Sequence, residues 1–328
     1  MLFLSEADVR NLLPMARAID LLREGFDAYA SDRAQNQPRR RLILPSGASL
    51  HSMAGAYGSY FGTKIYSNHP THKTWFLFVL YDAETARPLS LFEADILGQI
   101  RTGAASGLAA DLLAPAQADT VALIGSGFQA RGQLDAMRVV RPVRKVRIWS
   151  RSAERRERFA AECAAAGLEA HVASSAADAI AGAKIVVTAT FAKDPVLESE
   201  AITAGTFIAA MGSNHPQRRE LPAELIQRAG LLVADSIEQA RLEAGDFLLA
   251  LDGDGWRRVV ELRSVVSTPD RYAHCVDGIT IFKSVGLGLE DVIATGFVYE
   301  EAKRLGMGSE LPIFIPEPKS ESRYPATR

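Results

Sequence analysis

The chain has 328 residues, a formal net charge of −2, 48% hydrophobic residues and 23% charged residues. This balance predicts a globular protein of about two domains and argues against a surface built for nucleic acids or membranes. The chain has two cysteines, Cys163 and Cys275, and we find no signal peptide and no apolar run of membrane length, so we expect no disulfide framework and a cytoplasmic protein.

The first third of the chain begins with a helical pattern and continues with strands. Apolar residues recur at three- and four-residue steps over 5–31, which gives one apolar stripe and predicts helical structure. Segments 40–66 and 75–81 are typical of strands and turns, and the alanine-rich segment 95–113 predicts a long helix.

The middle of the chain alternates short apolar strands with helical segments. We expect strands at 121–125, 145–150, 169–173, 184–190, 206–212 and 231–235. Such alternation predicts a parallel sheet with helices on both faces. A last helix at 291–306 follows this series, so we expect it to return to the first domain. The predicted fold is therefore α/β, with a Rossmann-type domain over 116–290 and a discontinuous α+β domain over 1–115 and 291–328.

A glycine-rich turn follows the first strand of the alternating series. Residues Gly125, Ser126, Gly127, Phe128, Gln129 and Ala130 fit the pattern G-x-G-x-x-A. The first glycine permits a tight turn, the second lets the backbone approach a pyrophosphate, and the small Ala130 lets helix and strand pack closely. An ordinary glycine turn is the alternative, but the position between a strand and a helix favours dinucleotide binding.

The end of the second strand bears on the choice of cofactor. An NAD enzyme usually has Asp or Glu there, whereas this chain has Ser150, Arg151 and Ser152. Arg151 can pair with a 2′-phosphate and the serines can add donors, which favours NADP(H) while NAD(H) stays possible. Alternatively, Arg151 is a solvated residue at a helix start. Thr190, which ends a later strand, is a further candidate cofactor contact.

Motifs along the chain resemble those of one known family. They comprise Gly98-Gln-Ile-Arg-Thr-Gly-Ala-Ala-Ser-Gly107, the glycine turn, Gly212-Ser-Asn-His-Pro216, Arg219-Glu-Leu221, Ala234-Asp-Ser236, Glu243-Ala-Gly-Asp246 and Thr280-Ile-Phe-Lys-Ser-Val-Gly286. In this order they closely resemble the ornithine cyclodeaminase/μ-crystallin family. The resemblance implies a Rossmann domain, a second domain that binds substrate and forms a homodimer, and a nicotinamide-dependent enzyme acting on a small amino or imino acid.

The resemblance also implies a set of basic active-site residues. Lys64 matches the family's active-site lysine, and Arg101 matches a carboxylate-binding arginine. Arg40 matches a second carboxylate-binding position, although Arg39 and Arg41 compete for that role. A single basic residue is more often a solvated surface charge, and the family match reverses this preference. If Lys64 is desolvated near the arginines, its pKa should fall and it could exchange a proton with the substrate nitrogen.

Asn214 departs from the family pattern. The cyclodeaminase branch has an aspartate there, which is thought to take up protons during deamination and cyclisation. Asparagine cannot act as a base, so the departure favours hydride transfer over cyclodeamination. Asn214 could still form a hydrogen bond with the substrate nitrogen or the cofactor, or it could cap a turn.

Other positions are weaker candidates. Met53, in a loop where many relatives have Met-Pro, is expected near the substrate, and Ser284 is expected near the nicotinamide. His51 could contact the substrate side chain and set specificity, or be structural. His69 and His72 have a spacing that suits a metal, but no nearby acid or cysteine completes a set, so we expect no metal.

The predicted function is an NAD(P)H-dependent oxidoreductase that reduces a small cyclic ketimine carboxylate or interconverts an amino acid and its imino or keto acid. Pyrroline- and piperideine-carboxylates are the favoured substrates. One alternative is redox-neutral cyclodeamination of ornithine or lysine, which Asn214 argues against. Another is a non-catalytic, crystallin-like protein that binds NADP(H) and a ligand, which the set of Arg40, Lys64 and Arg101 argues against.

Overall fold

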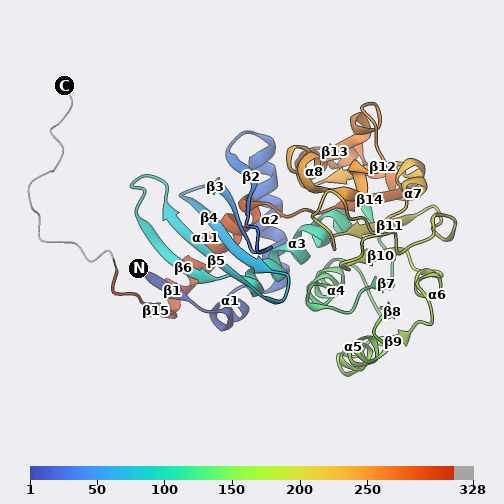
Figure 1. Ribbon diagram of the computed structural model, residues 1–328, viewed down its shortest axis with the longest axis horizontal. Coiled ribbons are helices and arrows are strands. Elements are labelled where there is room, and N and C mark those ends of the chain that lie inside the picture. The colour runs from blue at the N-terminus through green and yellow to red at the C-terminus, as the bar shows by residue number, and fades with distance from the viewer. Residues whose placement is uncertain (314–328) are drawn as a thin grey trace, which may run out of the picture.

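The computed structural model describes residues 1–313 and contains two sheets that lie side by side, with helices between and around them (Figure 1). We call the first the N-terminal sheet; its strand order is β15-β1-β6-β5-β4-β3-β2. Its strands are β1 (Leu2–Leu4), β2 (Ala34–Ile43), β3 (Ser49–Tyr57), β4 (Tyr60–His69), β5 (His72–Asp82), β6 (Pro88–Glu93) and β15 (Ser309–Glu310). Its pairs are antiparallel except β1 with β6, which is parallel.

The meander β2–β5 has two unlike faces because successive strand residues point to opposite sides. On the inner face, Lys64 of β4 and Phe78 of β5 are paired and buried. On the outer face, Leu50 of β3 and Trp75 of β5 flank Ser67 and are exposed over 45% and 64% of their surfaces. The inner face therefore contributes to the core, while the outer face exposes large apolar side chains.

The helices that cover the inner face are α1 (Glu6–Leu12), α2 (Met15–Ala30), α3 (Asp95–Leu113) and α11 (Gly288–Leu305). The helical structure expected over 5–31 is confirmed, as two helices, α1 and α2, that Pro14 separates. Proline lacks the N–H that would continue the first helix, and its fixed φ suits the start of the second. The helix predicted at 95–113 is confirmed by α3, which is buried along most of its length between the two sheets (Figure 1).

The second sheet, the parallel sheet, has the order β13-β12-β14-β11-β10-β7-β8-β9, and all of its pairs are parallel. Its strands are β7 (Thr120–Ile124), β8 (Lys145–Trp149), β9 (Glu169–Val172), β10 (Ile185–Thr188), β11 (Thr206–Ala210), β12 (Leu231–Ala234), β13 (Val259–Glu261) and β14 (Ile279–Lys283). The α-helices in this region are α4 (Phe128–Val140), α5 (Ala153–Ala165), α6 (Ala176–Ile180), α7 (Ala223–Arg228), α8 (Ile237–Glu243), α9 (Gly245–Leu248) and α10 (Leu262–Ser267). Short 3₁₀ helices are η1 (Ser199–Ala201), η2 (Gly255–Arg258), η3 (Pro269–Arg271) and η4 (Ala273–Asp277).

The predicted α/β fold with a parallel sheet is confirmed. The strands near the middle of this sheet are buried on both faces, as helices on both sides require. The exact division into 1–115 with 291–328 and 116–290 stays a prediction, and residues 314–328 lie outside the described part. Over residues 1–313, no helix has both the length and the apolar character needed to span a membrane.

Candidate active site

Lys64 lies at the centre of the inner face of the N-terminal sheet. It pairs across the strands with Met53 on β3 and Phe78 on β5, and only 2% of its surface is exposed. Its Nζ donates a hydrogen bond of 3.2 Å to Oδ1 of Asp291 on α11. A Cβ atom on Gly98 of α3 would lie 3.0 Å from this Nζ, so the glycine leaves room for the ammonium group.

The electrostatic setting of Lys64 matches the desolvated lysine expected from the sequence. Burial lowers the pKa of Lys64 to about 8; Asp291 opposes this change, and the positive charges of Arg101 and Arg39 add to it. A group with this pKa can give or take a proton near neutral pH. Lys64 is therefore suited chemically to general acid or base catalysis.

Arg101 approaches Lys64 from α3. Its Nε donates to Oδ1 of Asp291 at 3.1 Å, and its Nη1 donates to Oε2 of Glu290 at 2.9 Å. Both carboxylates lie in the first turn of α11 and are fully buried. A Cβ on Gly286 would lie 2.4 Å from Nη1 of Arg101, so the backbone before α11 passes directly over the guanidinium.

Arg39, rather than Arg40, belongs to this group of cations. Arg39 has only 7% of its surface exposed, and its charge acts on Lys64. Arg40, the preferred residue in the sequence prediction, is exposed, because neighbouring residues of a strand point to opposite faces. The strand register shifts between Gln37 and Arg40, and this irregularity determines which arginine faces inward.

Glu243, a carboxylate on the parallel-sheet side, binds both Arg39 and Arg41. Glu243 on α8 accepts hydrogen bonds from Nη1 of Arg39 and from Nη2 of Arg41. Gln239 donates to the same carboxylate at 2.8 Å, and Arg39 also donates to the carbonyl of Val285 at 3.0 Å. These contacts tie β2 to the segments that follow β12 and β14, so the cations lie between the two sheets.

Asn214 lies at the margin of the same region. Its side chain is exposed, and its carbonyl oxygen accepts a 2.7 Å hydrogen bond from Arg41. The preceding residue is anchored by the buried Lys283, which donates to the carbonyl of Ser213 at 2.6 Å and pairs with Asp246 at 2.9 Å. The structure thus brings Asn214 near the cations, on a loop fixed by a buried ion pair.

The glycine-rich turn has the geometry expected of a dinucleotide site. Gly125 has φ +124°, and a Cβ there would lie 2.4 Å from the carbonyl oxygen of Ala189. Gly127 is the N-cap of α4. Within residues 1–313, no side chain caps this helix start and no atom lies within 4 Å of a Cβ built on Gly127. Ala130 is fully buried. Open space and free N–H groups at a helix start fit the phosphates of a dinucleotide.

The candidate ribose contacts come together beside this turn. The hydroxyls of Ser126 and Ser150 lie 2.9 Å apart, which joins the ends of β7 and β8. Ser152 is the N-cap of α5, where its side chain accepts from the N–H of Arg155 at 3.3 Å. Arg151 is exposed between them. Its side chain can reach a charged group at this edge of the sheet.

Two other candidate cofactor residues are held by buried carboxylates. Thr190, just after β10, donates its hydroxyl to Oε1 of Glu220 at 2.7 Å. Ser284, just after β14, donates to Oδ2 of Asp235 at 3.2 Å. Both follow strands whose carboxyl ends share an edge with Gly125, and ligands of parallel sheets bind at this edge.

His51 is placed beside the cations but stays neutral. Its ring stacks on Tyr66 with centroids 4.3 Å apart, and its Nε2 lies 2.8 Å from the hydroxyl of Ser49. Burial lowers the pKa of His51 to about 4, and the charges of Arg41 and Arg39 act in the same direction. Together His51 and Tyr66 form a flat, uncharged wall next to the cross-strand row of Met53, Lys64 and Phe78.

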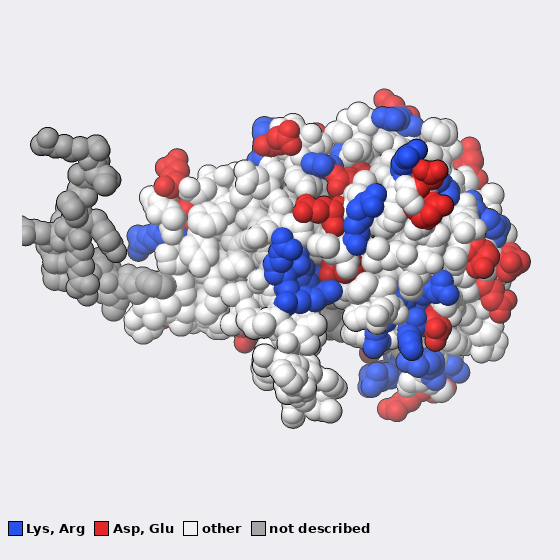
Figure 2. Space-filling model, turned by 45° about the horizontal axis from the view of Figure 1, so that its top comes forward, with Lys and Arg blue, Asp and Glu red and all other residues white. Residues whose placement is uncertain are grey.

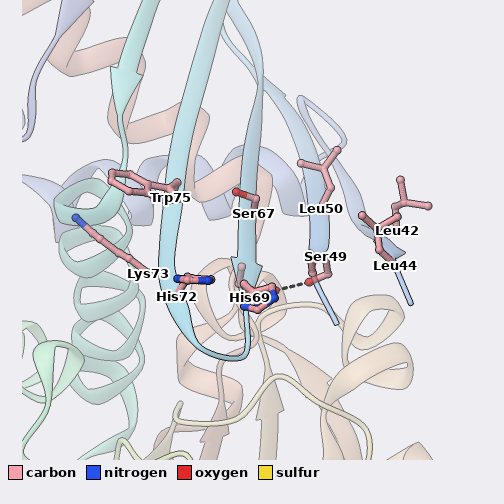
Figure 3. Close-up of a pocket in the computed structure, with 11 residues that line it drawn as sticks. Leu42, Leu44, Ser49, Leu50, Ser67, His69, His72, Lys73 and Trp75 are labelled. Atoms are coloured by element: carbon pink, nitrogen blue, oxygen red, sulfur yellow. Dashed lines mark hydrogen bonds between the residues drawn. The ribbon is translucent and has the colours of Figure 1, made fainter. Parts of the chain in front are cut away.

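His69 and His72 lie elsewhere. They line a pocket of about 280 Å³ that opens on the outer face of the N-terminal sheet (Figure 3). Their ring centroids are 4.7 Å apart. Within residues 1–313, no group of three or more His, Cys, Asp or Glu side chains comes together in a way that could hold a metal ion.

Sequence reasoning missed the acidic partners of the cationic group. The sequence places Glu243 in a motif that assigns it no role, and it does not indicate that Glu290 and Asp291 belong to the site. The only local signal for the latter pair is two adjacent acids at a helix start, which is common on solvated helices. Their burial could not be read from the sequence.

Comparisons with known proteins show the family of the chain. The profile of the ornithine cyclodeaminase/mu-crystallin family matches residues 1–305. A Δ1-pyrroline-2-carboxylate reductase of Bacillus cereus is 32% identical over 327 residues, with 95% of this chain and 99% of that protein covered.

Solved structures are equally similar. The Δ1-pyrroline-2-carboxylate reductase of Thermococcus litoralis, in complex with NADH and L-proline, has a TM-score of 0.87 and 29% identity, covering 95% of this chain and all of the other. An archaeal alanine dehydrogenase dimer with bound NAD has a TM-score of 0.87 and 30% identity, covering 96% and 99% of the two chains. The chain therefore belongs to the ornithine cyclodeaminase/mu-crystallin family.

Proposed function

We propose that this chain is a nicotinamide-dependent imine reductase that acts on a small ketimine carboxylate, with cyclic ketimines preferred. The observation that carries the proposal is the convergence of Arg39, Lys64 and Arg101, all buried, between the N-terminal sheet and the cofactor edge of the parallel sheet. The reductase and dehydrogenase relatives share the fold over nearly the whole chain, which supports the same chemistry.

The chain's own residues supply binding and proton transfer. Arg39 and Arg101 offer positive charge for the substrate carboxylate, and Nη2 of Arg101, which neither acid of α11 engages, offers a donor. Bound nicotinamide would supply the hydride that the imine carbon accepts as the C=N bond is reduced. The ammonium of Lys64 gives its proton to the imine nitrogen, so the product is an amine and Lys64 is left neutral. His51 and Tyr66 provide a wall for the flat side of the substrate, with Met53 beside it.

The role of Asn214 in this proposal is limited to hydrogen bonding. Its amide can donate to, or accept from, the substrate or cofactor, but it cannot take up a proton. In the cyclodeaminase branch, the residue at this position is thought to take up protons, which asparagine cannot do. Reduction is therefore the better-supported reaction. The exposed position of Asn214 at the margin of the cations suits a contact made only when ligand is bound.

The proposal is tested by following the absorbance of NADPH and NADH on addition of pyrroline-2-carboxylate, piperideine-2-carboxylate, or pyruvate with ammonia. Absorbance loss with a cyclic ketimine would establish the reaction. Loss with pyruvate and ammonia alone would make the chain an alanine dehydrogenase. Ammonia release from ornithine without net change in cofactor would establish cyclodeamination, and cofactor binding without turnover would indicate a ligand-binding protein.

We further propose that NADP(H) is preferred, because Arg151 follows β8 where an NAD enzyme has an acid. Arg151→Ala should raise the KM for NADPH about tenfold, since a charge-assisted contact to the 2′-phosphate is lost. The KM for NADH should stay within about twofold of wild type, which serves as the internal control. Equal effects on both cofactors would contradict the assignment. The cytoplasmic location expected from the sequence also stays a prediction.

The outer face of the N-terminal sheet supports a homodimer. Leu42, Leu50 and Trp75 lie on neighbouring strands of this face, and Figure 3 shows them in one row with Ser67. Leu42 and Trp75 are exposed over 59% and 64% of their surfaces. On the side of the molecule that Figure 2 shows, few charged side chains lie on the lobe of the N-terminal sheet and many lie on the other lobe. Such an apolar face is typical of an interface, and we propose that a second copy of the chain covers it.

Trp75→Glu is expected to convert the dimer to a monomer, because it places a charge in the proposed interface. Analytical ultracentrifugation at micromolar concentration measures the outcome. Phe191→Glu is the matched control, since Phe191 is an aromatic residue exposed over 85% of its surface near the parallel sheet. A Trp75→Glu variant that sediments like wild type would exclude this face as the interface.

A further inference from the structure

We propose that Asp291 is a positioning residue, which holds Lys64 and Arg101 in the arrangement that the reaction needs and keeps the Lys64 side chain charged. The inference deepens the proposed function, because it concerns the control of the proton donor at the same site. It is independent of which imine is the substrate. No step of the reaction described above uses Asp291 directly.

One carboxylate oxygen serves both cations. Oδ1 of Asp291 accepts from Nζ of Lys64 at 3.2 Å and from Nε of Arg101 at 3.1 Å. The three side chains come from α11, β4 and α3, and Asp291 is fully buried. Because both bonds end on one atom, the separation of the ammonium and the guanidinium is fixed by Asp291 rather than by either cation alone.

The position of Asp291 is itself fixed by close backbone packing. A Cβ on Gly55 of β3 would lie 2.6 Å from the Cα of Leu289, and a Cβ on Gly288 would lie 2.5 Å from the carbonyl oxygen of Ala54. Two glycines thus let the start of α11 rest directly on β3. The helix start also favours a negative charge in its first turn, where Asp291 lies.

The two acids of α11 bind different nitrogens of the Arg101 guanidinium. Asp291 accepts a hydrogen bond from Nε, and Glu290 accepts one from Nη1 at 2.9 Å. Neither carboxylate bonds to Nη2, which leaves this nitrogen for a substrate carboxylate. Loss of Asp291 would free the Nε edge and let the guanidinium turn, so substrate affinity should fall as well.

The charge of Asp291 opposes the effects of burial and of the two neighbouring arginines on Lys64. The charged groups that face Lys64 are Asp291 on α11, Arg101 on α3 and Arg39 on β2, while the paired residues on β3 and β5, Met53 and Phe78, are uncharged. Burial and both guanidiniums favour the neutral amine. Without the carboxylate, Lys64 would lose its proton at a lower pH and could not serve as proton donor near pH 7.

Glu290 supplies a matched control one residue away. It is buried beside Arg101 and makes no hydrogen bond to Lys64 in the described structure. Burial raises the pKa of Glu290 to about 8, although Arg101 opposes the change. Glutamine has nearly the same shape as this side chain and can still accept the hydrogen bond from Arg101, so Glu290→Gln alters the site without removing a partner of Lys64.

The test is a titration of Lys64 in Asp291→Asn and Glu290→Gln, followed by NMR of protein labelled with ¹³C at lysine Cε. The Lys64 signal is assigned by its absence in Lys64→Met. In Asp291→Asn the midpoint should move down by about one pH unit or more, as expected for loss of an adjacent opposite charge. In Glu290→Gln it should stay close to wild type. This readout needs neither cofactor nor turnover.

Steady-state kinetics provide the second readout. In Asp291→Asn, the pH above which reductive kcat/KM falls should move down by the same amount, and the KM for the imine should rise several-fold through Arg101. An unchanged Lys64 midpoint in a folded Asp291→Asn protein would overturn the proposal, whatever its activity. A shifted midpoint in a protein that reduces no imine would leave the proposal standing and refute the proposed function instead.

If Asp291→Asn does not fold, the double variant Lys64→Met with Asp291→Asn is tested next. This variant removes the charges of Lys64 and Asp291 together and leaves Arg101 paired with Glu290, so it should fold if the unpaired charge of Lys64 is what unfolds Asp291→Asn. Failure of both variants would show that Asp291 serves the fold independently of Lys64, and would overturn the proposal.

Discussion

Lys64→Met is expected to lower kcat for imine reduction by about a hundredfold to ten-thousandfold, the usual contribution of a positioned proton donor. Methionine fills much the same buried space without a charge. Asp291 keeps its hydrogen bond to Arg101 in this variant, so the fold should survive. The binding of NADPH should change little, because the glycine turn lies on the other sheet.

The measurement is a single-turnover reaction that follows NADPH absorbance, alongside the dissociation constant for NADPH. Lys73→Met is the control, since Lys73 is an exposed lysine on the neighbouring strand β5. Turnover at the wild-type rate in Lys64→Met would remove this residue from the mechanism. A fall in NADPH affinity equal to the fall in rate would show that the effect is structural.

The same lysine predicts the pH dependence of the wild-type enzyme. Lys64 must be protonated to give its proton during reduction, so reductive kcat/KM should fall as pH rises through about 8. Oxidation of the amine requires the neutral lysine, so its rate should rise over the same interval. Profiles of the two directions that bend near the same pH would support one shared group, whereas parallel profiles would contradict it.

Local patterns in the sequence predicted much of the fold. The helix at 95–113 and the strands around the glycine turn are confirmed almost to the residue, because apolar runs bounded by glycine or polar residues carry a clear signal. The pattern does not indicate strand β6, because this strand is short and follows a turn. It also does not place the break at Pro14, because the apolar stripe continues on both sides of it.

The residues of the candidate site are harder to predict from the sequence than the fold, for two physical reasons. The face of the sheet that a side chain occupies is inferred from strict alternation along the strand. The register shift between Gln37 and Arg40 breaks this alternation, so the sequence does not distinguish Arg39 from Arg40. The partners of Lys64 come from segments far away in the chain: Asp291 is 227 residues from Lys64. Such contacts depend on how helices pack on sheets, which no local pattern specifies.

Arg39→Lys is expected to raise the KM for the imine roughly tenfold to a hundredfold, since lysine cannot reproduce the guanidinium contacts to Glu243 and Val285 that hold this positive charge beside Lys64. The charge beside Glu243 is kept in this variant, which avoids leaving a buried carboxylate unpaired. The value of kcat should change less than KM, because Arg39 binds the carboxylate in both ground and transition states.

Arg40→Lys is the matched control one residue along the same strand. Arg40 is exposed, so both kinetic constants should stay within about twofold of wild type. Measuring the two variants over the same range of ketimine concentrations compares adjacent arginines that differ chiefly in the face of β2 they occupy. A large effect at Arg40 with none at Arg39 would mean that the carboxylate binds outside the buried cations, and the proposed position of the substrate beside Lys64 would then have to be abandoned.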